Sequence, residues 1–381
     1  MTKQIVFCAD GTWNGPDKDD DDDVQSNVTN VFKLFSALDG TLSLNTIRNA
    51  DEQEKVLGGT SPAQVAKYIH GVGDSRNPIV KLMGGAFGAG MIARIVRGFT
   101  FISRNYVPGD AIVIVGFSRG AYTARALAGM IASEGLLAQS LTQDKTNAYR
   151  LGARVWYRYR QRTNSTQTSI LDKLTQIADD LPGFLSRGSF DASQLVTVDQ
   201  LRSVAVWDTV GALGLPLYFK DQRIDAFKFT NTSLSTKVQS GFHAISADEQ
   251  RGDFLPTLWD AAANVTQVAF AGAHADVGGG YPTSNHESEL SDIALGWMVS
   301  RLQSVGVKFT QPIFDPYNPS PTGTAHKPWR HPPFNAGVIR ARDLRNHGVT
   351  EDPSIQARID AGPVVAEPNE PPARYRPASR P

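Results

Sequence analysis

Residues 111–132 constrain the fold of this chain more than any other stretch. An apolar run at 111–115 leads into Gly116-Phe117-Ser118-Arg119-Gly120, and an amphipathic stretch at 121–132 follows at once. This order predicts a strand, a sharp turn and a helix, the context in which Gly-x-Ser-x-Gly exposes a serine at a sheet edge. Gly116 and Gly120 suit such a turn because neighbouring chains must pass it at backbone distance. Ser118 is therefore a candidate nucleophile, and the alternative is an ordinary strand-to-helix turn.

Charge and cysteine content exclude several classes of protein. The 381 residues carry 38 basic and 38 acidic side chains, so the formal net charge is zero and no nucleic-acid partner is expected. Cys8 is the single cysteine and lies in an apolar run, which predicts a buried thiol and no internal disulfide. We expect no signal peptide and no transmembrane span, hence synthesis in the cytoplasm. Action elsewhere would require delivery by a specialised secretion system.

Apolar runs and helical patterns alternate along most of the chain. Strands are predicted at residues 4–9, 65–70, 111–115, 201–207 and 265–271. Helices are predicted at residues 28–38, 92–106, 121–132, 148–162, 170–185, 241–251 and 290–302. Such alternation indicates an α/β fold with a doubly wound, mostly parallel sheet and right-handed crossovers.

We expect two parts, an α/β domain at residues 1–310 and a C-terminal extension at 311–381. Helical patterns within about 141–193 predict an insertion that forms either a lid or a plain structural cap. Prolines are dense after residue 310, so the extension is expected to be a Pro-rich tail, poorly suited to helix, that packs on the core.

Four polar residues, Asp10, Ser118, Asp208 and His274, each follow a predicted strand directly. Ligands of open α/β sheets bind at the carboxyl ends of strands, so these side chains are candidates for one site. A serine hydroxyl needs a base to take its proton and a carboxylate to orient that base. We assign His274 as the base and Asp208 as the acid, because the chain order Ser, Asp, His is that of α/β-hydrolases.

Other residues compete for these two roles. Asp276, two residues from His274, and Asp10 are the alternative acids. His243 is the alternative base, although a histidine within the predicted 241–251 helix is also well explained as a wall or core residue.

Ester hydrolysis through serine also needs two backbone N–H donors for the oxyanion. The amide of Arg119 is one, from the geometry of the turn. The second is predicted in the loop after residues 4–9, from Gly11 or Thr12. Asp10 alternatively orders this loop by accepting backbone hydrogen bonds. The acidic run at 19–23 lacks the alternating spacing of a calcium loop, so we expect a solvated loop and no metal site.

Several extended motifs resemble the DUF2235 family, whose best-known members are the Tle1-type phospholipase effectors of type VI secretion. They are DGTWN at 10–14, GVG at 71–73, GFSRGAYTAR at 116–125, WDTVG at 207–211 and GAHADVGGGY at 272–281. The resemblance implies an α/β-hydrolase domain with the triad Ser118, Asp208 and His274, esterase activity on glycerophospholipids and no obligatory cofactor. It also implies transient contact with a membrane surface and an immunity or secretion-apparatus protein as partner. The acidic run at 19–23 and the lack of a large membrane-anchoring region depart from the family pattern.

The leading hypothesis is a serine hydrolase of phospholipid carboxylic esters, of the phospholipase A type, that works through an acyl-enzyme. Apolar side chains of residues 84–101 and 141–185 would hold the acyl chain. Three alternatives remain: a catalytically silent α/β-hydrolase scaffold that acts as a binding module, a hydrolase of non-lipid esters, and a metal-dependent hydrolase that uses Asp10, Asp208, His274 and Asp276.

Overall fold

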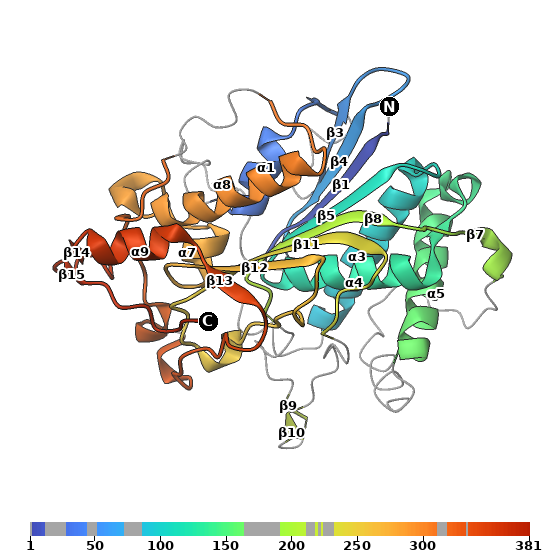
Figure 1. Cartoon of the computed structure of the whole chain (residues 1–381). Coiled ribbons are helices and arrows are strands. Elements are labelled where there is room, and N and C mark those ends of the chain that lie inside the picture. The colour runs from blue at the N-terminus through green and yellow to red at the C-terminus, as the bar shows by residue number, and fades with distance from the viewer. Residues whose placement is uncertain are drawn as a thin grey trace.

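A nine-stranded sheet forms the centre of the described part of the chain (Figure 1). The computed structural model describes residues 2–11, 28–43, 52–71, 86–163, 191–210, 218–219, 222–223, 232–310, 318–332 and 334–381. The strand order is β13-β12-β11-β8-β5-β1-β4-β3-β2. The strands are β1 (Gln4–Ala9), β2 (Thr41–Leu42), β3 (Glu52–Leu57), β4 (Gln64–Ile69), β5 (Ala111–Phe117), β8 (Leu201–Trp207), β11 (Val238–Ser246), β12 (Val265–Phe270) and β13 (Val349–Glu351).

The sheet is doubly wound, as the alternating pattern predicts. All neighbours from β13 to β4 are parallel, whereas β3 and β2 are added as antiparallel strands. The chain reaches β4 on one side of β1, then returns through β5 to build the opposite side. The carboxyl ends of β1 and β5 therefore flank the switch point, where such sheets bind ligands.

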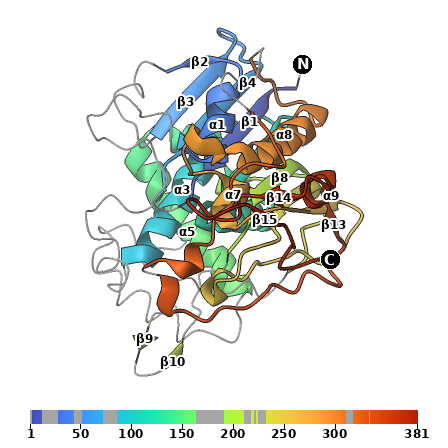
Figure 2. The same cartoon turned by 90° about the vertical axis from the view of Figure 1, so that its left-hand side faces the viewer.

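Helices cover both faces of the sheet because its central strands are apolar on both sides (Figures 1 and 2). On one face, α3 (Ala86–Asn105), α4 (Arg119–Glu134) and α5 (Lys145–Thr163) pack with Ile5, Phe7 and Ala9 of β1. On the other, α1 (Asn30–Ala37) and α8 (Glu289–Ser304) pack with Val6 and Cys8. The buried Cys8 agrees with the prediction. Among the described residues, no helix has the length and apolar character needed to cross a membrane.

Short elements complete the described fold. They are α7 (His274–Gly278), α9 (Pro353–Asp360) and the paired strands β6 (Leu136–Leu137) with β7 (Leu195–Val196), β9 (Tyr218–Phe219) with β10 (Gln222–Arg223), and β14 (Pro363–Val364) with β15 (Ala373–Arg374).

The helix predicted at 241–251 is wrong, because residues 238–246 form strand β11 between β8 and β12. A short apolar segment buried on both faces has no alternation, so periodicity alone does not separate strand from helix there. The edge strands β2 and β3 were not predicted either. The helix expected at 170–185 and the acidic run at 19–23 lie outside the described residues.

Part of the C-terminal extension joins the main sheet. Strand β13 pairs with β12 in parallel, so residues after 310 extend the sheet edge. The expectation that this region is unsuited to helix is wrong at α9, where Pro353 occupies the first turn and the Asp352 side chain accepts the Ser354 amide. Figures 1 and 2 show the red C-terminal segments gathered at the end of the sheet where α7 lies.

Candidate active site

Ser118 lies on a strained turn between β5 and α4. Its backbone has φ 57° and ψ −121°, a region that costs a non-glycine residue roughly 1–3 kcal/mol. A Cβ at Gly116 would lie 2.4 Å from the carbonyl oxygen of Gly120, and a Cβ at Gly120 would lie 2.1 Å from that of Ala9. The two glycines are therefore required by close backbone passage, and the Ser118 amide anchors the turn to Trp207 O. The whole stretch is built as the sequence predicts.

Asp208 and His274 meet at the carboxyl ends of β8 and β12. His274 Nδ1 lies 2.5 Å from Asp208 Oδ2, and both side chains are buried. His274 opens α7, and Asp208 has a φ of 35°. A proton on Nδ1 that is donated to the carboxylate leaves Nε2, on the other edge of the ring, as the basic nitrogen.

Two phenylalanine rings enclose the His274 imidazole. The ring of Phe117, the residue before Ser118, lies 4.6 Å away between centroids, and that of Phe254 lies 5.1 Å away. Burial lowers the pKa of His274 below its ordinary 6.5, although the hydrogen bond and charge of Asp208 oppose this shift. The imidazole is therefore neutral at neutral pH, as a general base must be.

Asp208 has a second buried partner that no motif in the sequence indicates. Arg342, from the C-terminal extension, donates from one terminal nitrogen to Asp208 Oδ1 at 2.6 Å and from the other to Oδ2 at 2.9 Å. The Ser246 amide adds a bond of 2.9 Å to Oδ1. Although burial opposes it, the Arg342 charge together with the His274 contact holds the pKa of Asp208 well below its usual range. An arginine inside a Pro-rich segment carries no local sequence signal for this contact.

The alternative acid, Asp276, is engaged elsewhere. Its carboxylate accepts the Ala273 amide at 2.8 Å and the His326 amide at 3.0 Å, and Oδ1 pairs with His326 Nδ1 at 2.6 Å. His326 stacks on Tyr281, with centroids 3.4 Å apart. Asp276 thus holds the loop that carries His274 and binds the extension, rather than the His274 ring.

The alternative base, His243, lies within strand β11 and is fully buried. Its Nε2 accepts the Thr209 amide at 3.1 Å and its Nδ1 lies 3.2 Å from Gln267 Oε1. Burial lowers the pKa of His243 to about 3, so the ring stays neutral. These bonds support the backbone after Asp208.

Asp10 orders the loop after β1. Its carboxylate accepts the Gly11 amide at 2.6 Å, the Tyr68 hydroxyl at 2.7 Å and the Thr29 hydroxyl at 2.8 Å. Burial raises the pKa of Asp10 to about 7, against these hydrogen bonds. Because the Gly11 amide is engaged by Asp10, it is not the free oxyanion donor that we expected.

The other predicted second oxyanion donor, Thr12, lies outside the described residues. The Arg119 amide is the first of α4, where helix geometry supplies no intrahelical acceptor. Although Ser118 and His274 are both described, no hydrogen bond joins their side chains; such contacts often tighten only when substrate binds.

The residues of the metal-dependent alternative are not brought together as one ligand set. Asp208 pairs with His274, whereas Asp10 contacts Tyr68 and Thr29, and Asp276 contacts His326. Within the described residues, no three His, Cys, Asp or Glu side chains are placed to hold one metal ion.

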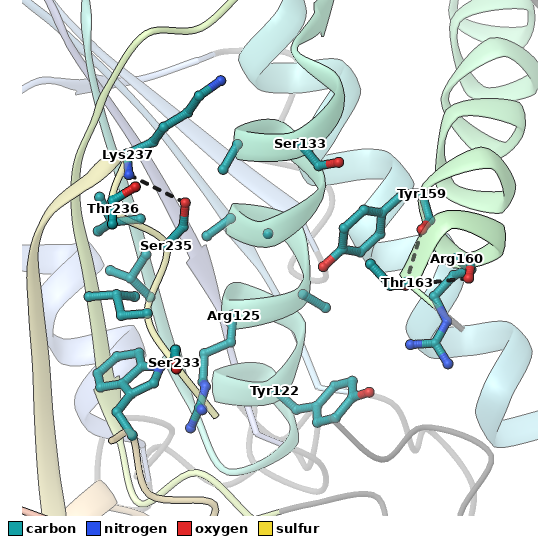
Figure 3. Close-up of a pocket in the computed structure, with 18 of the residues that line it drawn as sticks. Tyr122, Arg125, Ser133, Tyr159, Arg160, Thr163, Ser233, Ser235, Thr236 and Lys237 are labelled. Carbon is teal, nitrogen blue, oxygen red and sulfur yellow. Dashed lines mark hydrogen bonds between the residues drawn. The ribbon is translucent and has the colours of Figure 1, made fainter. Parts of the chain in front are cut away.

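A pocket of about 520 Å³ runs along α4, beyond the Ser118 turn. Figure 3 shows its walls, formed by α4, by α5 and by residues 233–238. Tyr122, Arg125, Gly129 and Ala132 recur at helical spacing after Ser118, so they lie on the same face of α4. The described lining residues do not include Ser118, Asp208 or His274, and the pocket starts one turn from the serine.

Comparison with known proteins gives the family. Residues 3–301 match the family described as "T6SS, Phospholipase effector Tle1-like, catalytic domain". The chain belongs to this Tle1-like family. The resemblance seen in the sequence is thereby confirmed, and with it membership of a family of phospholipase effector catalytic domains, which are hydrolases.

Three relatives extend the comparison. The uncharacterized protein YEL023C of Saccharomyces cerevisiae is 26% identical over 267 residues, which is 66% of this chain and 32% of that protein. A crystal structure of an uncharacterized protein from Pseudomonas aeruginosa is 18% identical, with a TM-score of 0.44, over 84% of this chain and 49% of that one. A structure of the Tle1 effector bound to the VgrG spike of the type 6 secretion system is 19% identical, with a TM-score of 0.37. The match covers 76% of this chain and 53% of that one. The Tle1-like chain thus spans about a third to a half of the length of these proteins.

Proposed function

We propose that this Tle1-like chain is a serine esterase that hydrolyses carboxylic esters of glycerophospholipids, with Ser118, His274 and Asp208 as its triad. The bond of 2.5 Å between Asp208 Oδ2 and His274 Nδ1, at the end of the sheet that carries the strained Ser118 turn, supports this proposal most directly. A buried carboxylate that orients a neutral imidazole is the arrangement that activates a serine.

The chemistry follows from these groups. Ser118 Oγ attacks the ester carbonyl carbon while His274 Nε2 takes its proton, and the Arg119 amide donates to the oxyanion. The tetrahedral intermediate collapses, the C–O bond to the alcohol breaks, and the His274 proton passes to that alcohol. Water then adds to the acyl-enzyme with His274 again as base, which releases the fatty acid and restores Ser118. Asp208 stabilises the imidazolium at each stage.

The pocket along α4 is our candidate for the acyl chain. Gly129 lies roughly 16 Å along the helix axis from Ser118, since each residue adds 1.5 Å. Small α4 side chains, Ala126 and Ala132 among them, and the Trp156 ring supply apolar walls. A chain bound there would extend directly away from the ester, which favours a lipid over a short polar ester as substrate.

We further propose that the protein acts as an effector delivered by type VI secretion and contacts membrane surfaces transiently. The family description names such effectors, and the solved Tle1 effector is bound to a VgrG spike. A secretion-apparatus protein is accordingly the first partner to test, and an immunity protein is the second.

Labelling by a fluorophosphonate tests the mechanism. The wild-type protein should be labelled at Ser118 and should release fatty acid from mixed glycerophospholipid vesicles, whereas Ser118→Ala should do neither. Equal labelling of the two proteins would remove Ser118 from the mechanism. A wild-type protein that is not labelled would support the silent binding scaffold, and loss of hydrolysis with EDTA would support the metal-dependent alternative.

A further inference from the structure

Arg342, a buried side chain of the C-terminal extension, contacts the acid of the proposed triad. Arg342 lies outside the matched residues 3–301, yet its guanidinium is almost completely buried beside Asp208. Its two terminal nitrogens contact the two carboxylate oxygens at 2.6 and 2.9 Å. This bidentate geometry fixes the plane of the carboxylate as well as its position.

The guanidinium is itself held by the elements around His274. One terminal nitrogen also donates to Ser246 O at 3.0 Å, and the other to Phe254 O at 2.6 Å. Ser246 ends β11, and the Phe254 ring packs on His274. The Arg342 amide is fixed by Ser379 Oγ at 2.9 Å. Arg342 therefore connects the extension, the end of β11 and the acid in one hydrogen-bonded unit.

The contacts divide the two carboxylate oxygens between partners. Oδ1 accepts Arg342 and the Ser246 amide, while Oδ2 accepts both Arg342 and His274 Nδ1. With all of these bonds in place the carboxylate has no freedom to rotate away from the imidazole. The arginine also places a positive charge on the same oxygen that faces His274, so it competes with the protonated imidazole for that oxygen.

We infer that Arg342 is a positioning residue that locks Asp208 onto His274 and weakens the binding of a proton by His274, so that the extension is part of the catalytic unit. The inference rests on the proposed function only for its effect on turnover. Its effect on the Asp208–His274 pair is measurable through the titration of His274, without any substrate.

Replacement of Arg342 by methionine tests the charge. Asp208, Glu249 and Arg251 also act on His274, and all three are unchanged in this variant. Without the arginine, the titration of the His274 Cε1 signal in NMR should move to higher pH by roughly one unit, because a neighbouring like charge has been removed. His274→Gln assigns the signal. An unchanged or lowered midpoint overturns the inference, whether or not the protein proves to be an esterase.

Turnover provides the second readout. Arg342→Met should lower kcat roughly tenfold to a hundredfold, the usual cost of removing a group that orients a site residue, with KM little changed. Arg342→Lys keeps the charge and loses the bidentate fork, so it should retain the wild-type His274 midpoint and recover only part of kcat. Arg345→Met, which removes an exposed arginine of the same segment paired with exposed Asp343, is the matched control and should behave as wild type.

Folding is checked by circular dichroism and urea unfolding of each variant. If Arg342→Met does not fold, Arg342→Lys decides the question: a wild-type kcat in that variant overturns the inference, and a reduced kcat with an unmoved His274 midpoint supports it. Failure of fluorophosphonate labelling in the wild-type protein would instead count against the proposed function and leave the NMR test standing.

Discussion

His274 Nδ1 and Asp208 Oδ2 lie 2.5 Å apart, although 66 residues separate the two in the chain. Two parallel strands, β8 and β12, with β11 between them, bring these residues to one edge of the sheet. The same edge carries the Ser118 turn after β5.

Asparagine at position 208 should be far more damaging to turnover than asparagine at 276. Asp208→Asn removes the charge that stabilises the imidazolium and disturbs its tautomer, so kcat should fall by about 10⁴-fold. Asp276→Asn weakens the contacts to His326 and Ala273, so it should mainly lower the free energy of unfolding, by about 1–3 kcal/mol. Ester kinetics and urea unfolding of both variants check this. A larger loss of kcat in Asp276→Asn than in Asp208→Asn, at unchanged stability, would favour Asp276 as the acid.

Activity should fall at acid pH as His274, whose pKa lies below 6.5, becomes protonated. Burial lowers the pKa of His274, and only the neutral imidazole accepts the Ser118 proton, so kcat/KM should rise with pH through this lowered value and then level off. A profile on p-nitrophenyl butyrate from pH 4.5 to about 8 measures it. Because Asp10 also titrates, with a pKa of about 7, Asp10→Asn is the control and should keep the same limb. If the acid limb of the profile had its midpoint above pH 6.5 in both proteins, this would contradict His274 as the base.

Asp10→Ala should destabilise the fold by about 3 kcal/mol, because it leaves the Gly11, Thr29 and Tyr68 donors buried without their acceptor. Urea unfolding measures this, with exposed Asp343→Ala as the control that should leave the midpoint unchanged.

The contribution of Asp10 to the free energy of unfolding should also depend on pH. Its folded pKa of about 7 is raised above the ordinary 3.8, so the native state binds the extra proton. The stability it provides is fully present below pH 3.8 and is lost as the pH rises through about 7. Wild-type protein should therefore lose stability relative to Asp10→Asn between these limits, and a constant difference would refute the shift.

Filling the pocket along α4 should change chain-length preference. Ala126→Leu adds three carbons at a wall residue, so kcat/KM should fall roughly tenfold for long-chain esters, with little change for butyrate. The ratio of the two rates is the measurement, and exposed Ala262→Leu is the control. A fall of equal size for both esters would show that the pocket does not bind the acyl chain.

Local patterns predicted much of the fold and the positions of the proposed triad. The strands at 4–9, 111–115 and 201–207 are apolar on both faces, and such runs are recognisable without any partner. The same reasoning fails at β11, where the pattern predicts a helix although His243 lies in a buried strand. It also placed the Gly11 amide in the oxyanion site, whereas the Asp10 side chain engages that amide.

The sequence by itself determined where Ser118, Asp208 and His274 lie, because strand ends and glycine-bounded turns are set by short-range sterics and hydrophobic patterning. Only the tertiary structure decided how the carboxylates are shared: Asp208 pairs with His274 and Arg342, and Asp276 pairs with His326. Those choices depend on which buried charges the C-terminal extension brings to the sheet edge. Contacts over such distances along the chain arise from packing and charge compensation, and neither leaves a local pattern in the sequence.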